Sequence, residues 1–214
     1  MRFEQVYFVT GTGYAGKSTL VKALADKWDG ILCKENYHDI LLPELDKSEF
    51  PNLCWSRDLT DWRDFIRRTP EEYADWIHGV TKECETLELR ILADLAKQGR
   101  RIFVDTNISP ETLRRVSDER HVLIMLAEPE TSVRRFFERP DREKQFLYRL
   151  LLAEPDPEAA LENFRACLAR VNSRNACDAF LRSGFPVLLR DEDRTPAETL
   201  ALAEDIFGLR EAAP

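Results

Sequence analysis

Residues 11–18 are the part of the sequence whose residue types and spacing predict the most definite chemistry. They read GTGYAGKS and match the pattern G-x-x-x-x-G-K-[ST] of a phosphate-binding loop. Gly11 and Gly16 allow turns that a side chain would block, so that backbone N–H groups point inward and cradle phosphates. Lys17 supplies a positive charge to the phosphates, and the Ser18 hydroxyl is a ligand that Mg²⁺ accepts. The pattern predicts that a nucleotide binds along Gly11, Thr12, Gly13, Tyr14, Ala15, Gly16, Lys17, Ser18 and Thr19.

The sequence on either side of this loop has the periodicity of a strand and then of a helix. Residues 3–9 are mostly apolar and rich in β-forming side chains, and residues 18–25 carry apolar side chains at helical spacing. This order would place the phosphates at the N-terminus of a helix, where backbone N–H groups lack helical partners. A glycine-rich turn without a ligand is the alternative, and both flanks argue against it.

Strand and helix patterns alternate along the rest of the chain, which predicts a parallel sheet and an α/β fold. Thr69, Pro70 and Glu72 form the start signal of a long helix, and Gly99 is its expected end. Residues 36–69 show no regular pattern, and we expect irregular structure there. The expected strands are 3–9, 31–34, 101–105, 121–126 and 184–189, and the expected helices are 17–28, 70–98, 129–138, 143–153, 156–182 and 196–207, with a short helix beginning at Ser109.

Composition limits the class of partner and the compartment. The chain of 214 residues is long enough for one domain and has a formal net charge of −8, which argues against nucleic acid or an anionic membrane as its main partner. Its five cysteines are scattered, which is typical of free thiols in the cytoplasm. The longest apolar run, residues 122–127, is far too short to cross a bilayer.

The whole chain resembles the small-molecule kinases of the nucleoside monophosphate kinase-like group, which includes shikimate, gluconate and deoxynucleoside kinases. The resemblance rests on the loop, on the long helix that ends before the strand closing on Asp105, on the arginine-rich segment after the fourth strand, and on the final strand and helix. It implies a three-layer P-loop NTPase fold with a five-stranded parallel sheet in the order 2-3-1-4-5, helices on both faces and a helical lid. Tyr14 is a departure, because many of these kinases carry a small residue there.

The resemblance also implies an activity and a division of the chain. The expected reaction is Mg²⁺-assisted transfer of the γ-phosphoryl group of ATP to a hydroxyl or phosphate of a small molecule. Residues 1–214 would form one kinase domain, in which 36–69 bind the acceptor and 139–155 form the lid. A noncatalytic or regulatory nucleotide-binding protein is the alternative function. The acceptor, the choice between ATP and GTP and the oligomeric state stay open.

Roles for single residues follow from this resemblance. Lys17 would bridge the transferred phosphate, while Ser18 and Asp105 would serve Mg²⁺. Glu35, Asp39 or Asp105 would accept the proton of an acceptor hydroxyl, and Asp39 also lies where the acceptor is expected to bind. Arginines suit the spreading charge of the transferred group. In the lid, Arg139 and Arg142 are expected to contact this charge. Arg57 and Arg63 are expected to bind the acceptor. The alternative for residues 55–67 is that the tryptophans lie in the core and the charged residues on the surface.

Overall fold

The structure is a computed structural model that describes residues 2–138 and 142–210. Within these residues the chain forms one five-stranded parallel sheet in the order β2-β3-β1-β4-β5, which confirms the predicted α/β class and strand order. The strands are β1 (Val6–Gly11), β2 (Ile31–Cys33), β3 (Ile102–Asp105), β4 (Val122–Leu126) and β5 (Val187–Leu189).

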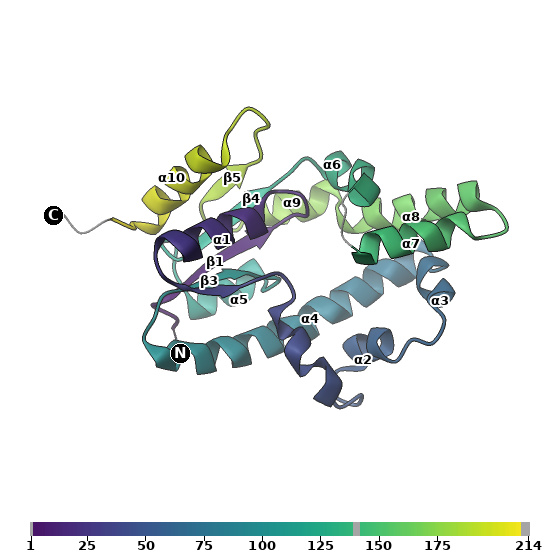
Figure 1. Ribbon diagram of the computed structural model, residues 1–214, viewed down its shortest axis with the longest axis horizontal. Coiled ribbons are helices and arrows are strands. Elements are labelled where there is room, and N and C mark those ends of the chain that lie inside the picture. The colour runs from purple at the N-terminus through teal and green to yellow at the C-terminus, as the bar shows by residue number, and fades with distance from the viewer. Residues whose placement is uncertain (1, 139–141, 211–214) are drawn as a thin grey trace.

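Helical elements connect the strands and form a second group beside the sheet (Figure 1). Three of the helical elements are short 3₁₀ turns, labelled η. The described helical elements are α1 (Lys17–Lys27), η1 (Tyr37–Glu44), α2 (Pro51–Arg57), α3 (Arg63–Ile66), α4 (Pro70–Leu95), η2 (Ala96–Gln98), α5 (Pro110–Val116), α6 (Pro129–Arg134), η3 (Phe136–Glu138), α7 (Arg142–Leu152), α8 (Pro157–Val171), α9 (Arg174–Leu181) and α10 (Pro196–Phe207). No helix among the described residues combines the length and the apolar character that a membrane crossing requires.

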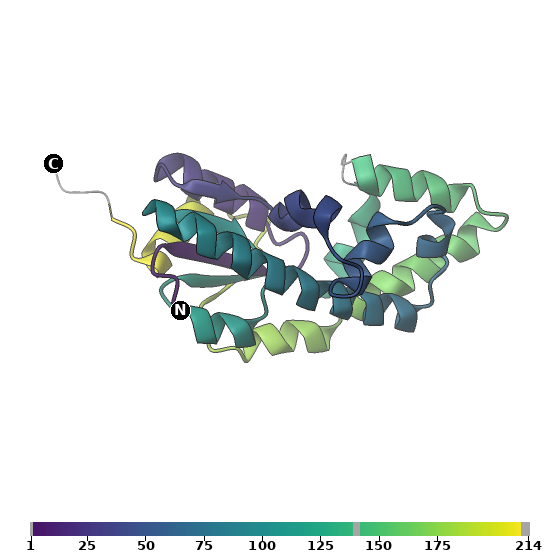
Figure 2. The same cartoon turned by 90° about the horizontal axis from the view of Figure 1, so that it is seen from below.

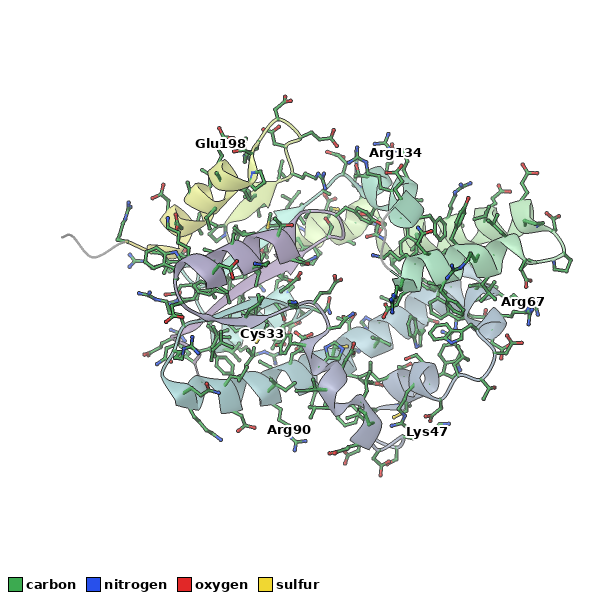
Figure 3. All side chains as sticks on the ribbon, viewed as in Figure 1. Cys33, Lys47, Arg67, Arg90, Arg134 and Glu198 are labelled. Carbon is green, nitrogen blue, oxygen red and sulfur yellow. The ribbon has the colours of Figure 1, made fainter. Side chains whose placement is uncertain are left out.

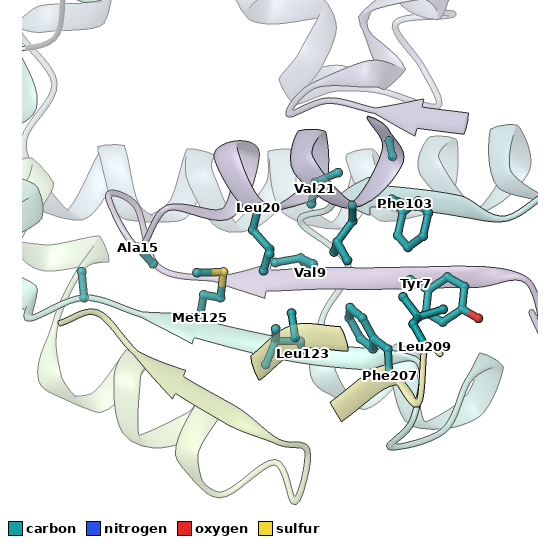
Figure 4. Close-up of a cluster of buried hydrophobic side chains, with 14 residues drawn as sticks. Tyr7, Val9, Ala15, Leu20, Val21, Phe103, Leu123, Met125, Phe207 and Leu209 are labelled. Carbon is teal, nitrogen blue, oxygen red and sulfur yellow. The ribbon is translucent and has the colours of Figure 1, made fainter. Parts of the chain in front are cut away.

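The sheet is buried on both faces because apolar side chains fill both alternating positions of its central strands. Tyr7 and Val9 of β1 face a core that contains α1 and α10 residues, including Leu24 and Phe207 (Figure 4). Phe8, the residue between them, faces the opposite core, which receives side chains from α4, α5 and α9. The sheet therefore carries helices on both of its faces, and the packing of these helices holds the strands in place.

A helical lobe lies beside the sheet and has a core of its own (Figure 2). It consists of α2, α3, the N-terminal part of α4, α7 and α8, and its buried residues include Phe65, Tyr73, Leu151 and Phe164. The helix α4 joins the two parts, because Tyr73 lies in the core of the helical lobe and Leu92 in the core of the sheet. The long helix begins with the predicted capping box and is followed by Gly99 in the left-handed conformation.

Three of the expectations for secondary structure are wrong. The helix expected over 129–138 ends at Arg134 as α6, and residues 136–138 form the separate turn η3. Residues 36–69 contain η1, α2 and α3 rather than irregular structure, because each element is too short to show a period and gains its stability by packing against α4. The single helix expected over 156–182 is two helices, since α8 ends at Val171 and the Ser173 hydroxyl accepts a hydrogen bond from Ala176 N to cap α9.

Candidate functional site

The loop between β1 and α1 is held against β4 by its backbone. Gly11 has φ +131°, and a Cβ atom there would overlap the Met125 carbonyl group, with its carbon 2.8 Å away. The same carbonyl oxygen accepts a hydrogen bond of 3.0 Å from Thr12 N. Gly16 has φ +94°, and the helix begins at the next residue. Both pattern glycines therefore occupy conformations that L-residues with a side chain rarely adopt.

The first turn of α1 is available to an anion. Gly16 at its N-cap gives no side-chain hydrogen bond, and the turn contains no acidic residue. The first N–H groups of any helix have no partners within the helix, and the helix dipole adds positive character at this end. The N-terminus of α1 thus has the features of a phosphate site that the sequence pattern predicts.

Asp105 meets the loop at the end of β3. The register of the sheet pairs it with Val9, and its side chain is only 2 % exposed. Ser18 Oγ donates a hydrogen bond of 2.6 Å to Asp105 Oδ2, and Lys17 Nζ lies 3.8 Å from Asp105 Oδ1. Burial raises the pKa of Asp105, although the Lys17 charge and the Ser18 hydrogen bond act in the opposite direction. Lys17 and Ser18 of the loop and Asp105 of β3 therefore come together, as the sequence predicted.

The donor set formed by Ser18 and Asp105 suits Mg²⁺. A hydroxyl and a carboxylate supply the hard oxygen ligands that this ion prefers, and Mg²⁺ in nucleotide sites takes few protein ligands because phosphates and water supply the others. The described residues contain no cluster of three or more His, Cys, Asp or Glu side chains placed for a metal. A magnesium ion here would consequently depend on a bound nucleotide for most of its ligands.

Two cavities adjoin the loop and share Gly16 and Thr19 as lining residues. The first, which we call the β5 cavity, has a volume of about 400 Å³. The second, which we call the helical-lobe cavity, has a volume of about 330 Å³ and also contains the side of the loop with Lys17 and Ser18. The β5 cavity is lined by residues that include Gly16, Thr19, Arg135, Leu188, Arg190 and Glu192. Residues lining the helical-lobe cavity include Glu35, Tyr73, Asn107, Phe136, Lys144 and Leu168.

Tyr14 connects the loop to the walls of both cavities. Its φ is +64°, and its hydroxyl donates a hydrogen bond of 2.8 Å to the Arg135 carbonyl oxygen. The Arg190 guanidinium, from the wall of the β5 cavity, donates to the Tyr14 carbonyl oxygen. Lys144 Nζ lies 5.6 Å from the centre of the Tyr14 ring on the other side. Tyr14 therefore links the loop to residues that line both cavities.

The candidate bases lie in different surroundings. Glu35 lines the helical-lobe cavity and is close enough to Asp105 for its charge to raise the pKa of that carboxyl. Asp39 lies outside the described lining, and its Oδ1 is 3.6 Å from His38 Nε2. Burial raises the pKa of Asp39, whereas the charge of His38 acts to lower it. The geometry favours Glu35 over Asp39 for contact with a molecule in the helical-lobe cavity.

The predicted arginines do not gather in the described part of the site. Arg57 donates to the carbonyl oxygens of Leu42 and Leu45, at 3.0 and 2.8 Å, and pairs with Asp58. Arg63 lies in a loose ion pair with Glu154 in the helical lobe. Neither arginine is among the described residues of the helical-lobe cavity, and their role toward an acceptor stays a prediction.

The lid prediction falls on a segment that is only partly described. Arg142 is exposed at the first residue of α7, whereas Arg139 lies outside the described residues. Leu147 and Leu151, further along α7, are buried in the core of the helical lobe. α7 is therefore packed as part of this lobe, with one end close to the loop through Lys144 and Tyr14.

Several wall residues of the helical-lobe cavity carried no signal that identified them. Tyr73 and Ile77 belong to the apolar stripe of α4, and Leu168 has the same appearance in α8. In the sequence, Lys144 is one of several basic residues after the fourth strand, and nothing distinguishes it as a residue of the cavity. An apolar side chain at helical spacing predicts burial, but it does not distinguish a core from the wall of a cavity.

A buried network supports the loop that follows β3. Glu88 of α4 is fully buried, and its Oε2 accepts hydrogen bonds from the Thr106 hydroxyl and from Asn107 N. Its Oε1 lies 3.1 Å from His38 Nδ1. The His38 Nε2 atom in turn lies 3.1 Å from Cys84 Sγ. The network fixes the residues directly after Asp105 and attaches them to the segment after β2.

No protein-family model matches the chain, and no curated protein matches it. The features of the chain that bear on its function are the geometry of the β1–α1 loop, the contacts of Asp105 and the two cavities that adjoin the loop.

Proposed function

We propose that this protein has a P-loop NTPase fold and is an ATP-dependent, Mg²⁺-assisted kinase that transfers the γ-phosphoryl group to a small-molecule acceptor. The observation that carries the proposal is that residues of the loop line two separate cavities, one formed with β5 and one with the helical lobe. A phosphotransferase must hold a donor and an acceptor on opposite sides of the transferred group, with the reacting oxygens roughly in line. A protein that only binds nucleotides needs one such cavity.

The nucleotide base would occupy the β5 cavity, and the phosphates would follow the loop toward the helical-lobe cavity. Leu188 and Ala23 offer apolar contact to a flat base, and Arg190 and Glu192 offer polar groups at its edge. Arg135 Nη2 is 3.1 Å from Glu192 Oε1, which ties the segment after β4 to the wall formed after β5. These groups do not distinguish adenine from guanine, so ATP follows from the resemblance described above.

Catalysis would depend on positioning and on charge, because phosphoryl transfer requires little covalent chemistry from a protein. Lys17, held 3.1 Å from the Thr12 carbonyl oxygen, would place its ammonium group beside the transferred phosphate. Ser18 and Asp105 would hold Mg²⁺, which neutralises phosphate charge when bound. Glu35 would orient the acceptor hydroxyl and accept its proton, because it is the carboxylate that lines the acceptor side of the loop among the described residues.

The function is tested by nucleotide binding and by acceptor-stimulated release of ADP. Lys17→Ala should weaken ATP·Mg²⁺ binding by about ten- to hundredfold, because a hydrogen bond to a charged group contributes roughly 1.5–3 kcal/mol. Lys22→Ala is the matched control, since Lys22 lies on the same helix, is exposed and pairs with Asp26. Equal affinity in wild type and Lys17→Ala would refute the assignment of the loop. Nucleotide binding without stimulation by any acceptor in a broad panel would instead identify a noncatalytic protein.

A further inference from the structure

We propose that the acceptor is a neutral alcohol with an apolar ring, rather than a phosphorylated or carboxylated compound. The inference rests on the proposed function and concerns the same site. Three properties of the helical-lobe cavity carry it: its apolar walls, the position of its charges, and the contacts that hold the nearby arginines elsewhere.

One part of the cavity lining consists of apolar side chains that are firmly packed. Phe136 contacts Phe164 with ring centres 5.7 Å apart, and Tyr73 contacts the same ring at 5.9 Å. Ile77, Leu168 and Val171 complete this part of the lining. Flat apolar surfaces of this kind gain free energy by covering a ring, and their own side chains supply no ionic partner.

The charges of the cavity lie close to the loop. Lys17 is 3.8 Å from the Asp105 carboxylate, and Glu35 adds a negative charge on the acceptor side. Lys144 is the other described cation, and its Nζ lies 5.3 Å from the centre of the Phe136 ring and near Tyr14. The described lining thus carries two lysines and one carboxylate, and under the proposed function Lys17 serves the transferred phosphate, so that only Lys144 would face the charge of an anionic acceptor beside Glu35. A neutral hydroxyl would instead find a hydrogen-bond acceptor there.

Two neighbouring arginines of the helical lobe, Arg67 and Arg68, are held by contacts outside the cavity lining. Arg67 donates to Glu154 at 2.8 Å and lies at the outer side of the lobe (Figure 3). The Arg68 guanidinium is 3.8 Å from the centre of the Trp55 ring. No arginine occurs in the described lining of the helical-lobe cavity. Binding of a phosphate or carboxylate commonly uses the fork of an arginine, so the described cavity lacks the group that an anionic acceptor would require.

The polar edge of the cavity suits a neutral compound. Asn107 and Asn172 both line it, and an amide can donate and accept hydrogen bonds without a charge. The Asn172 amide is oriented by donation to the Leu168 carbonyl oxygen at 2.9 Å. The volume of about 330 Å³ lies at the small end of ligand cavities, which matches a compound of monosaccharide or nucleoside size.

The experiment compares neutral alcohols with their anionic counterparts in matched pairs. Nucleosides are paired with their 5′-monophosphates, and aryl alcohols are paired with their carboxylated analogues. Each compound is tested for stimulation of ADP release by the wild-type protein with ATP and Mg²⁺. We expect a neutral compound to give the highest kcat/KM, at least tenfold above that of its anionic partner. Preference for an anionic compound would overturn this inference and leave the kinase assignment intact, whereas no stimulation by any compound would overturn both.

A variant in the apolar wall supplies a second readout. Phe136→Ala should lower kcat/KM for the neutral acceptor by about ten- to hundredfold, the range expected for lost apolar contact in a binding pocket, with unchanged ATP affinity. Phe136→Leu, which keeps an apolar body, should have a smaller effect and serves if the alanine variant does not fold. Phe146→Ala is the matched control, because Phe146 is 39 % exposed on α7 and packs against Trp62. Equal effects of Phe136→Ala and Phe146→Ala on kcat/KM would refute the placement of the acceptor.

Discussion

Three glycines within six residues of one loop allow a graded test of its geometry. A Cβ atom at Gly11 would overlap the Met125 carbonyl group, at a position where φ is also +131°. At Gly16 the added Cβ would lie 3.7 Å from Met125 Cε, an ordinary contact, so that only the φ of +94° opposes it. At Gly13 the nearest atom is Ser132 Oγ at 3.6 Å, and φ lies outside the left-handed region. Substitution by alanine should therefore have three different costs.

The magnitudes follow from the two separate penalties. Overpacking costs about 1–3 kcal/mol and backbone strain a similar amount, so that Gly11→Ala should lose about 2–6 kcal/mol of unfolding free energy. Gly16→Ala should lose about 1–2 kcal/mol from the left-handed conformation alone. Gly13→Ala should change the unfolding free energy by less than about 0.5 kcal/mol. A domain with 5–15 kcal/mol of total stability would survive the second and third changes but be close to unfolding after the first.

Urea unfolding followed by tryptophan fluorescence measures these differences, and titration with ATP·Mg²⁺ provides a second readout. Gly16→Ala should fold and yet bind nucleotide weakly, because Gly16 sets the direction of the N–H groups at the start of α1. Gly13→Ala is the internal control for stability. If Gly11→Ala and Gly13→Ala lost the same unfolding free energy, the close approach of the loop to β4 would be wrong.

Two further changes test the neighbours of the loop. Burial raises the pKa of Asp105 in the ligand-free protein, so its favourable contribution to stability is present below its unfolded value and is lost as the pH rises through the raised value. In the wild type the unfolding free energy should therefore fall as the pH rises above about 4, and in Asp105→Asn it should fall less steeply. Urea unfolding at a series of pH values measures both proteins, and the same dependence on pH in both would contradict this prediction. Tyr14→Phe removes the hydrogen bond to the Arg135 carbonyl and should cost about 0.5–1.5 kcal/mol in the same assay, with no loss expected if that bond does not form in solution.

The strands of the sheet and the long helix α4 could largely be predicted because the sequence signals for them are local. The capping box at Thr69 and Glu72, the glycine at position 99 and the continuous apolar run of β4 each depend on a few neighbouring residues. The order of the strands then follows from the resemblance and from the rule that parallel crossovers are right-handed. The loop could be predicted for the same reason, because its chemistry is carried by adjacent residues.

The helical lobe could not be predicted in the same way because its elements are stabilised by distant partners. Phe50, Leu53 and Leu45 pack against Cys84 and neighbouring residues of α4, although the short segments that contain them show no period. Arg57 illustrates the same limit for function. Its sequence position suggests an acceptor contact, whereas its guanidinium is bound to two carbonyl oxygens and to Asp58.

The helix α4 explains how these distant segments form one site. Near its start, Tyr73 and Ile77 face the proposed acceptor, and eleven residues after Ile77 the buried Glu88 holds the backbone directly after Asp105. At 1.5 Å per residue these two positions are about 16 Å apart along a single helix. A continuous helix resists changes in that length, so α4 fixes the acceptor wall relative to the carboxylate that would serve Mg²⁺. Adjustment of the cavity to its ligands must therefore come from its other walls, where Lys144 lies near both the Phe136 ring and the Tyr14 ring of the loop.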